Sequence, residues 1–309
     1  MENRLTRLLQ LPAMSCVIVL LVFGTAFGQQ MVDANFKATT EHPAYTKSFP
    51  RVLFDEAHNN AQIAIGSYKP FADLIMDDGY YVVRNHKSFA KESLNTFKIL
   101  VIANALGAED IEDEGAERSA FTEEECAAVS DWVHGGGALL LIAGHAPFGG
   151  AAENIAKPFG VEMSKGFTFD PDHSQDGSPS ILTYSRENKL LLDHAITQGR
   201  NEAERINRVL TFTGQSLKGP DASANFLQLA DTAKEKSGRD SEKETSAAGR
   251  AQGLALKFGK GRVVVLGDAT MLSAQLAGSE KRPMGMNVPG TDNKQLALNI
   301  MHWLSGLLR

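Results

Sequence analysis

The stretch Thr122–Ala143, TEEECAAVSDWVHGGGALLLIA, decides the fold, because it predicts a helix, a turn and a buried strand in succession. Thr122 and Glu125 have the spacing of a capping box, which satisfies backbone N–H groups where a helix begins. Three glycines, Gly135–Gly137, favour the backbone of a helix exit. The apolar run that follows has no polar face, which is typical of a strand covered by helices on both sides of its sheet.

The flanking segments repeat this alternation of strands and helices. Lys98–Ala103 (KILVIA) is a second strand without a polar face, and apolar spacing predicts a helix over Tyr68–Asp78. Further strands are expected at Arg51–Phe54, Tyr80–Val83, Val209–Thr213 and Phe226–Leu229, with a second helix over Gly150–Lys157. Alternation of this kind predicts a doubly wound, mostly parallel α/β sheet of flavodoxin-like type.

The last third of the chain adds a hairpin and a helix. Leu254–Phe258 and Arg262–Leu266 flank Gly259-Lys260-Gly261, which predicts a C-terminal antiparallel hairpin. Asp292–Leu308 predicts an amphipathic helix. Its expected inward-facing residues are Leu296, Ile300, Trp303, Leu304 and Leu307.

Composition limits the class of protein. The chain has 309 residues, of which 43% are hydrophobic and 22% charged, so a packed core is feasible. We expect a single α/β domain over 51–309, preceded by a lead-in at 29–50, with an irregular excursion at 164–200 and a flexible loop at 234–250. The net charge of −6 without a basic block argues against nucleic acid as a partner. Two cysteines exclude a disulfide scaffold.

The N-terminus predicts an export signal over residues 1–28. Arg4 and Arg7 precede the apolar stretch Val17–Phe23, and Ala26-Phe27-Gly28 places small residues at a cleavage site. The mature protein is then expected to be periplasmic or extracellular, with no membrane span and with Cys126 as its one cysteine. The alternative is an uncleaved N-terminal membrane anchor.

Polar residues follow four of the predicted strands, where ligands of open parallel sheets bind. An acid and an imidazole in one loop, Asp55 and His58, can pair, and the acid then fixes the tautomer of the imidazole. The candidate ligand-binding residues are Asp55, Glu56, His58, Asn59, Asn104, Gly144, His145 and Asp268. We expect them to gather around one polar hollow.

The same residues allow other interpretations. His58, His145 and Asp55 are catalytic candidates, with an imidazole as general base. His58, His145 and Asp268 could hold a metal ion, although no tight ligand spacing supports it and no other cofactor is expected. Asn104 and Asp268 could equally be helix caps or turn residues. The sequence has no GxSxG motif, and Cys126 on the inner face of a helix indicates packing.

Several motifs together resemble a known family. They are FDEAH at 54–58, the helix and strand at 121–141, GKGRVVVLGD at 259–268 and Asp292-Asn293 at the start of the last helix. They resemble an uncharacterised bacterial family of exported proteins with a class I glutamine amidotransferase-like fold, related to auxiliary domains of gliding-motility transporters and of a ciliary transport protein. In that superfamily a nucleophilic Cys follows a central strand. The resemblance places Ala146 at that position, and alanine cannot attack a carbonyl.

These observations lead to one functional expectation and two alternatives. The first is an exported cell-envelope protein, without amidotransferase activity, that binds a small polar ligand (sugar-derived molecules among the candidates) or an envelope protein at the strand ends. The second is a hydrolase that uses His58 or His145 as general base or metal ligand. The third is a structural accessory domain of a membrane transporter.

Overall fold

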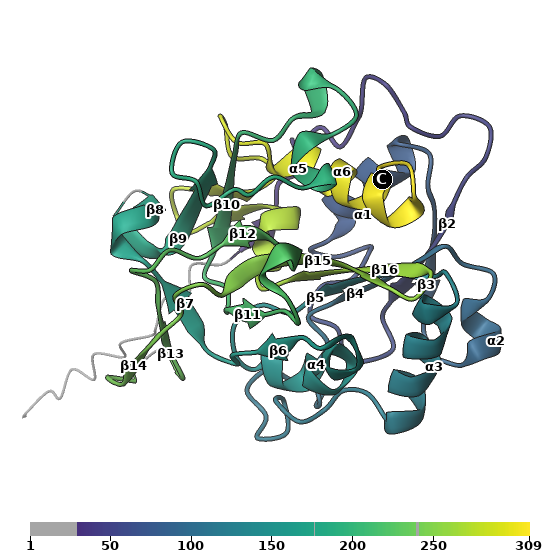
Figure 1. The fold of residues 1–309 in the computed structure, drawn as a ribbon, viewed down its shortest axis with the longest axis horizontal. Helices are drawn as coiled ribbons and strands as arrows, with labels where there is room; N and C mark the ends of the chain where they lie inside the picture. Colours follow the sequence, from purple (N-terminus) through teal and green to yellow (C-terminus); the bar gives the residue numbers. More distant parts are fainter. Residues whose placement is uncertain (1–29, 176, 239–240) are drawn as a thin grey trace, which may run out of the picture.

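A nine-stranded sheet forms the centre of the protein. The computed structural model describes residues 30–309 except 176 and 239–240, so the predicted signal peptide lies outside the described residues. The strand order is β3-β2-β4-β5-β16-β15-β11-β6, and β12 pairs with β15 off this path. The strands from β3 to β16 pair with one another in parallel, and from β16 through β15 and β11 to β6 each pairing is antiparallel. The predicted mostly parallel α/β fold with its antiparallel hairpin is therefore confirmed (Figure 1).

The elements have the following bounds. The parallel strands are β2 (Arg51–Asp55), β3 (Tyr81–Asn85), β4 (Ile99–Ala103), β5 (Ala138–Ile142) and β16 (Gly261–Leu266). The antiparallel part of the sheet contains β6 (Glu162–Met163), β11 (Leu217–Lys218), β12 (Asn225–Gln228) and β15 (Ala251–Phe258). The helices are α1 (Lys69–Asp77), α2 (Lys91–Leu94), α3 (Glu123–His134), α4 (Phe148–Ala156), α5 (Ala195–Gln198) and α6 (Asn293–Ser305).

Helices cover both faces of the sheet, as the apolar strands require. In β4 and β5 every residue is buried, because α1 and α6 lie on one face while α3 and α4 lie on the other (Figure 1). Alternate strand residues therefore enter two separate apolar clusters. Leu140 packs with α1 and α6, and its neighbour Leu139 packs with α3 and α4. Burial on both faces explains why these strands show no polar alternation.

The helix α3 begins and ends where the sequence predicts. The hydroxyl of Thr122 accepts a hydrogen bond from the backbone N–H of Glu125, and the Glu125 carboxylate accepts one from the N–H of Thr122. This reciprocal pair is the predicted capping box. Near the other end of α3 lies Gly261, the first residue of β16. A Cβ added to Gly261 would be only 2.0 Å from the carbonyl oxygen of Val133 in α3. Glycine is therefore required at this contact.

Smaller sheets occupy the regions that the sequence left irregular. The excursion at 164–200 contains β7 (Phe167–Phe169), β8 (Ser174–Gln175) and β9 (Ser178–Ser185), and β9 pairs with β10 (Arg208–Phe212). The expected flexible loop at 234–250 contains a hairpin of β13 (Lys234–Lys236) and β14 (Glu244–Ser246), and β13 also pairs with β7. Backbone pairing with β7 thus gives β13 a strand structure that the polarity of its side chains does not reveal.

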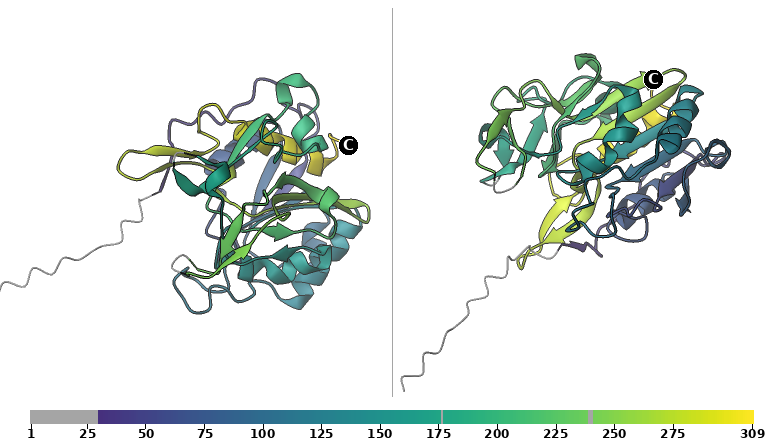
Figure 2. Two further views of the ribbon diagram at one scale, coloured as in Figure 1. Left: turned by 60° about the vertical axis from the view of Figure 1, so that its left-hand side comes forward. Right: turned by 90° about the horizontal axis from the view of Figure 1, so that it is seen from below.

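A third small sheet lies beside the lead-in. It joins β1 (Met31–Val32), β17 (Ala274–Ala277) and β18 (Arg282–Gly285) in an arm that projects from the domain (Figure 2). Across the described ranges, no helix has the length and apolar character needed to cross a membrane.

The C-terminal helix α6 differs from its prediction at two positions. Leu296, Ile300, Trp303 and Leu304 are buried as expected. Leu307 is exposed, because α6 ends at Ser305 and Gly306 takes a left-handed backbone. His302, which is not among the expected inward-facing residues, is buried.

Candidate functional site

A buried imidazole between two carboxylates occupies the end of β2. His58 Nδ1 is 2.8 Å from Asp55 Oδ2, and His58 Nε2 is 2.9 Å from Glu125 Oε1. The rings of Phe89 and Phe121 lie against the imidazole, with centroids 4.8 and 4.6 Å away. The predicted pairing of Asp55 with His58 is present. Glu125, 67 residues along the chain, is a partner that the sequence analysis assigned only to helix capping.

The two carboxylates favour the charged imidazole. Burial disfavours the charged form of His58, but hydrogen bonds and charge from Asp55 and Glu125 outweigh it and raise the pKa above its ordinary value of 6.5. Burial likewise disfavours the Glu125 carboxylate. Backbone N–H groups and His58 outweigh that effect and lower the pKa of Glu125. The arrangement therefore stabilises an ion pair network in which both ring nitrogens of His58 are occupied.

The ends of β4 and β5 are joined by an amide. Asn104 follows β4 with a positive φ of 47°, a conformation that asparagine tolerates better than most residues. Its side-chain oxygen accepts a hydrogen bond of 2.8 Å from the backbone N–H of Gly144. The carbonyl oxygen of Gly144 accepts one from the Gln215 side chain. These contacts tie neighbouring strand ends together.

Asp268, after β16, holds backbone groups. Its carboxylate accepts hydrogen bonds from the backbone N–H groups of Phe212, Thr270 and Met271. Full burial raises the pKa of Asp268 to about 7, although the three N–H groups favour the charged form. The geometry matches the cap-and-turn interpretation of this residue.

The other predicted residues have separate surroundings. Glu56 accepts hydrogen bonds from the Ala64 N–H and from Arg84. Asn59 has a positive φ of 49° and is exposed. His145 stacks on Phe167 with ring centroids 4.6 Å apart, and its Nδ1 is 2.6 Å from the carbonyl oxygen of Ala146.

The strand ends thus lie at one edge of the sheet, but most of the predicted residues are bonded to protein groups there. Asp55, His58, Asn104 and Asp268 are all buried. The described residues contain no group of three or more His, Cys, Asp or Glu side chains suited to a metal ion. The ligand-binding role of these residues stays a prediction, and the structure gives each of the four buried side chains a part in holding the strand ends.

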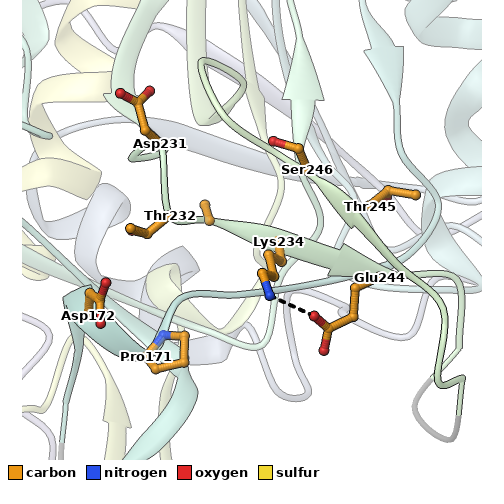
Figure 3. Close-up of a pocket in the computed structure, with 9 residues that line it drawn as sticks. Pro171, Asp172, Asp231, Thr232, Lys234, Glu244, Thr245 and Ser246 are labelled. Atoms are coloured by element: carbon orange, nitrogen blue, oxygen red, sulfur yellow. Dashed lines mark hydrogen bonds and ion pairs between the residues drawn. The ribbon is translucent and has the colours of Figure 1, made fainter.

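Four of the cavities in the described part of the protein lie away from the strand ends. One of 560 Å³ is beside the β13–β14 hairpin, lined by residues that include Asp172, Asp231 and Thr232, with Lys234 paired to Glu244 (Figure 3). Others of 350 and 340 Å³ flank Arg250. The fourth, of 700 Å³, runs along α6. The lining residues of all four are different from the predicted strand-end residues.

The cavity along α6 contains a buried pair that the sequence analysis missed. His302 Nε2 is 2.7 Å from Asp78 Oδ2, across 224 positions of sequence. Both side chains are 1% exposed. Neither local spacing nor a motif links the end of α1 to α6, so only the packing of these two helices could have indicated the pair.

Comparisons with known proteins show the fold and no more. No family model matches the chain, and no curated protein matches it. The mmIFT52 N-terminal domain is similar in structure, with a TM-score of 0.57 and 12% identity over 83% of this chain and 97% of that one. A putative ThuA-like protein from Bacteroides uniformis gives a TM-score of 0.42 at 13% identity, covering 84% of this chain and 93% of its own. A putative GMP synthase protein from Thermoplasma acidophilum gives 0.42 at 11%, covering 84% and 96%.

Proposed function

We propose that this chain is a non-catalytic binding protein of the cell envelope, built on an amidotransferase-like fold, which holds a small polar ligand or an envelope partner. The observation that carries the proposal is that both ring nitrogens of His58 are hydrogen-bonded to carboxylates. A general base needs a ring nitrogen within reach of a substrate proton. Here one ring nitrogen meets Asp55 and the other meets Glu125.

The lack of an activated thiol among the described residues supports the same proposal. Ala146 occupies the glycine-flanked turn where the resemblance places the catalytic Cys. Cys126 is buried on α3, and burial raises the pKa of its thiol to about 11. A thiol with that pKa is almost entirely protonated at neutral pH, and the protonated form is a poor nucleophile.

The claim that the protein is non-catalytic is tested with the full chain purified from its own cell envelope. Ammonia release from glutamine and hydrolysis of a p-nitrophenyl ester are measured beside the Cys126→Ser variant. We expect both proteins to give only the background rates that are measured in buffer without protein. Turnover that depends on Cys126, or that is lost in His58→Gln, would contradict the proposal.

The export half is tested by locating the protein in fractionated cells and sequencing its N-terminus. The proposal expects the chain in the periplasm, in the medium or at the membrane, with Gln29 first after cleavage. A cytosolic chain that begins at residue 1 would refute export. This outcome would leave the catalytic result unaffected.

A further inference from the structure

The groove along α6, called the α6 groove here, is the largest of the four cavities at 700 Å³. The groove is lined by lead-in residues 39–43, by Asp78, by parts of 200–204, and by residues of α6 and of the two positions before it. The lead-in is held in place by Asp77 and Asp78, which accept hydrogen bonds from the backbone N–H groups of Thr40 and Ala44. The groove is therefore built from three segments far apart in sequence.

Two residues that line the α6 groove, Asp78 and His302, present hydrogen-bond acceptors. Asp78 can only accept when ionised, so His302 Nε2 must carry the hydrogen between them. In the neutral imidazole the other nitrogen, Nδ1, is then an acceptor. Nδ1 is buried and has no hydrogen-bond partner among the described residues. Because His302 lines the groove, a hydrogen-bond donor bound beside it would supply the partner that this atom lacks.

A second buried carboxylate, Glu204, also lines the groove. Arg200 holds it through its guanidinium, with Nε 2.8 Å from Glu204 Oε1. The hydrogen bond to Glu204, and to a smaller extent the charges of Glu204 and Asp78, raise the pKa of Arg200. Burial disfavours the Glu204 carboxylate, but hydrogen bonds and charge from Arg200 outweigh it and lower the pKa of Glu204. The Arg200 guanidinium therefore interacts with both buried carboxylates of the lining.

Carboxylates outnumber basic groups of fixed charge along the whole lining. The carboxylates are Glu41, Asp78, Glu204 and Asp292, and the cations are Arg200 and Lys294. Burial lowers the pKa of Lys294, even though Asp77 and Glu41 favour its charge. The lining is thus acceptor-rich, and its fixed charges sum to a negative value.

We propose that the α6 groove binds a small organic molecule through a primary ammonium group. Three N–H donors on a compact positive charge match buried acceptors and an excess of carboxylates. The volume is within the range of small-molecule sites. This inference rests on the proposed binding function and gives it a site at α6, away from the strand ends.

The test is isothermal titration of the full chain with D-glucosamine, putrescine and D-glucose. Glucosamine and glucose differ at one substituent, so their comparison isolates the ammonium group. We expect saturable binding of both amines. Glucose should bind more weakly than glucosamine by about tenfold or more, which is the usual effect of losing a hydrogen bond that involves a charged group. Equal binding of glucose and glucosamine, or no binding of either amine, would overturn the proposal.

Substitutions then assign the binding to the α6 groove. Glu204→Gln should weaken the binding of glucosamine by about tenfold, since a charge-assisted contact is lost. Lys294→Gln should tighten it, because a competing positive charge is removed. Glu202→Gln, whose carboxylate is exposed and outside the lining, is the matched control and should change nothing. Since Glu204 pairs with Arg200, Glu41→Gln on the exposed rim provides a second variant, which should weaken glucosamine in the same direction.

The failure of this inference is distinguishable from that of the proposed function. Amine binding that Glu204→Gln, Glu41→Gln and Lys294→Gln all leave unchanged would place the site elsewhere and refute the inference. The proposed function would then still hold if no turnover is observed. Turnover of glutamine or ester refutes the proposed function, whatever the titrations show.

Discussion

Replacing His58 with alanine should destabilise the protein strongly. The imidazole is 7% exposed and bonds two carboxylates that are themselves buried, Asp55 and Glu125. Its removal leaves both acids without the group that balances their charge, and leaves a gap between Phe89 and Phe121. Breaking a buried pair by removing one partner costs about 3–5 kcal/mol. We therefore expect the free energy of unfolding to fall by that amount.

The effect should depend on pH in a definite direction. The pKa of His58 is raised by folding, so the folded protein binds its proton more tightly than the unfolded chain does. The stabilisation is complete below pH 6.5, the ordinary value, and is lost as the pH rises through the raised pKa. The difference between parent and His58→Ala should be largest at acid pH and should shrink in alkaline buffer.

Urea unfolding followed by circular dichroism across acid, neutral and alkaline buffers measures this difference. His86→Ala is the control, because that side chain is 58% exposed and its loss should change stability by less than about 0.5 kcal/mol. A His58→Ala variant as stable as His86→Ala would refute the reasoning, and would instead favour a His58 kept for ligand binding alone.

Three further predictions concern the strand ends and α3. Asp268→Asn should lower the free energy of unfolding by about 1–3 kcal/mol in the same urea assay, since an amide has one acceptor oxygen for three N–H groups; an unchanged midpoint would contradict the cap assignment. Thr122→Ala should cost about 1 kcal/mol through loss of the cap, while Thr122→Ser should retain most of it, and equal losses in both variants would disprove the cap. Cys126 should react with DTNB only after unfolding, because its thiol is buried and has a pKa of about 11; rapid reaction of the folded protein would show the burial to be wrong.

The parallel half of the sheet could be predicted because its signals are local. The strands β4 and β5 are continuous apolar runs, and α3 carries its own cap at Thr122 and its own stop at Gly135–Gly137. In the smaller sheets the sequence predicted β10, but not the other strands, most of which are short and depend on distant partners. The polar strand β13, for example, is ordered by pairing with β7, which lies far back along the chain.

In the candidate site, too, the contact between residues close in sequence was predicted and the contact between distant residues was not. The pairing of Asp55 with His58 spans three residues and was expected. The second partner, Glu125, comes from a helix that packs across the sheet edge, and sequence spacing carries no information on that contact. Likewise, the buried pair of Asp78 and His302 exists only because α1 and α6 lie side by side.

The protonation of His58 tests the central claim most directly, namely that the acid and imidazole groups at the strand ends hold the fold together. Nitrogen-15 NMR of histidine-labelled protein reports the protonation of each ring nitrogen as pH is raised. Our account predicts both His58 nitrogens protonated at pH 6.5, with N–H protons slow to exchange and a midpoint above that pH. A His58 ring that exchanges rapidly and titrates at or below its ordinary value would contradict it.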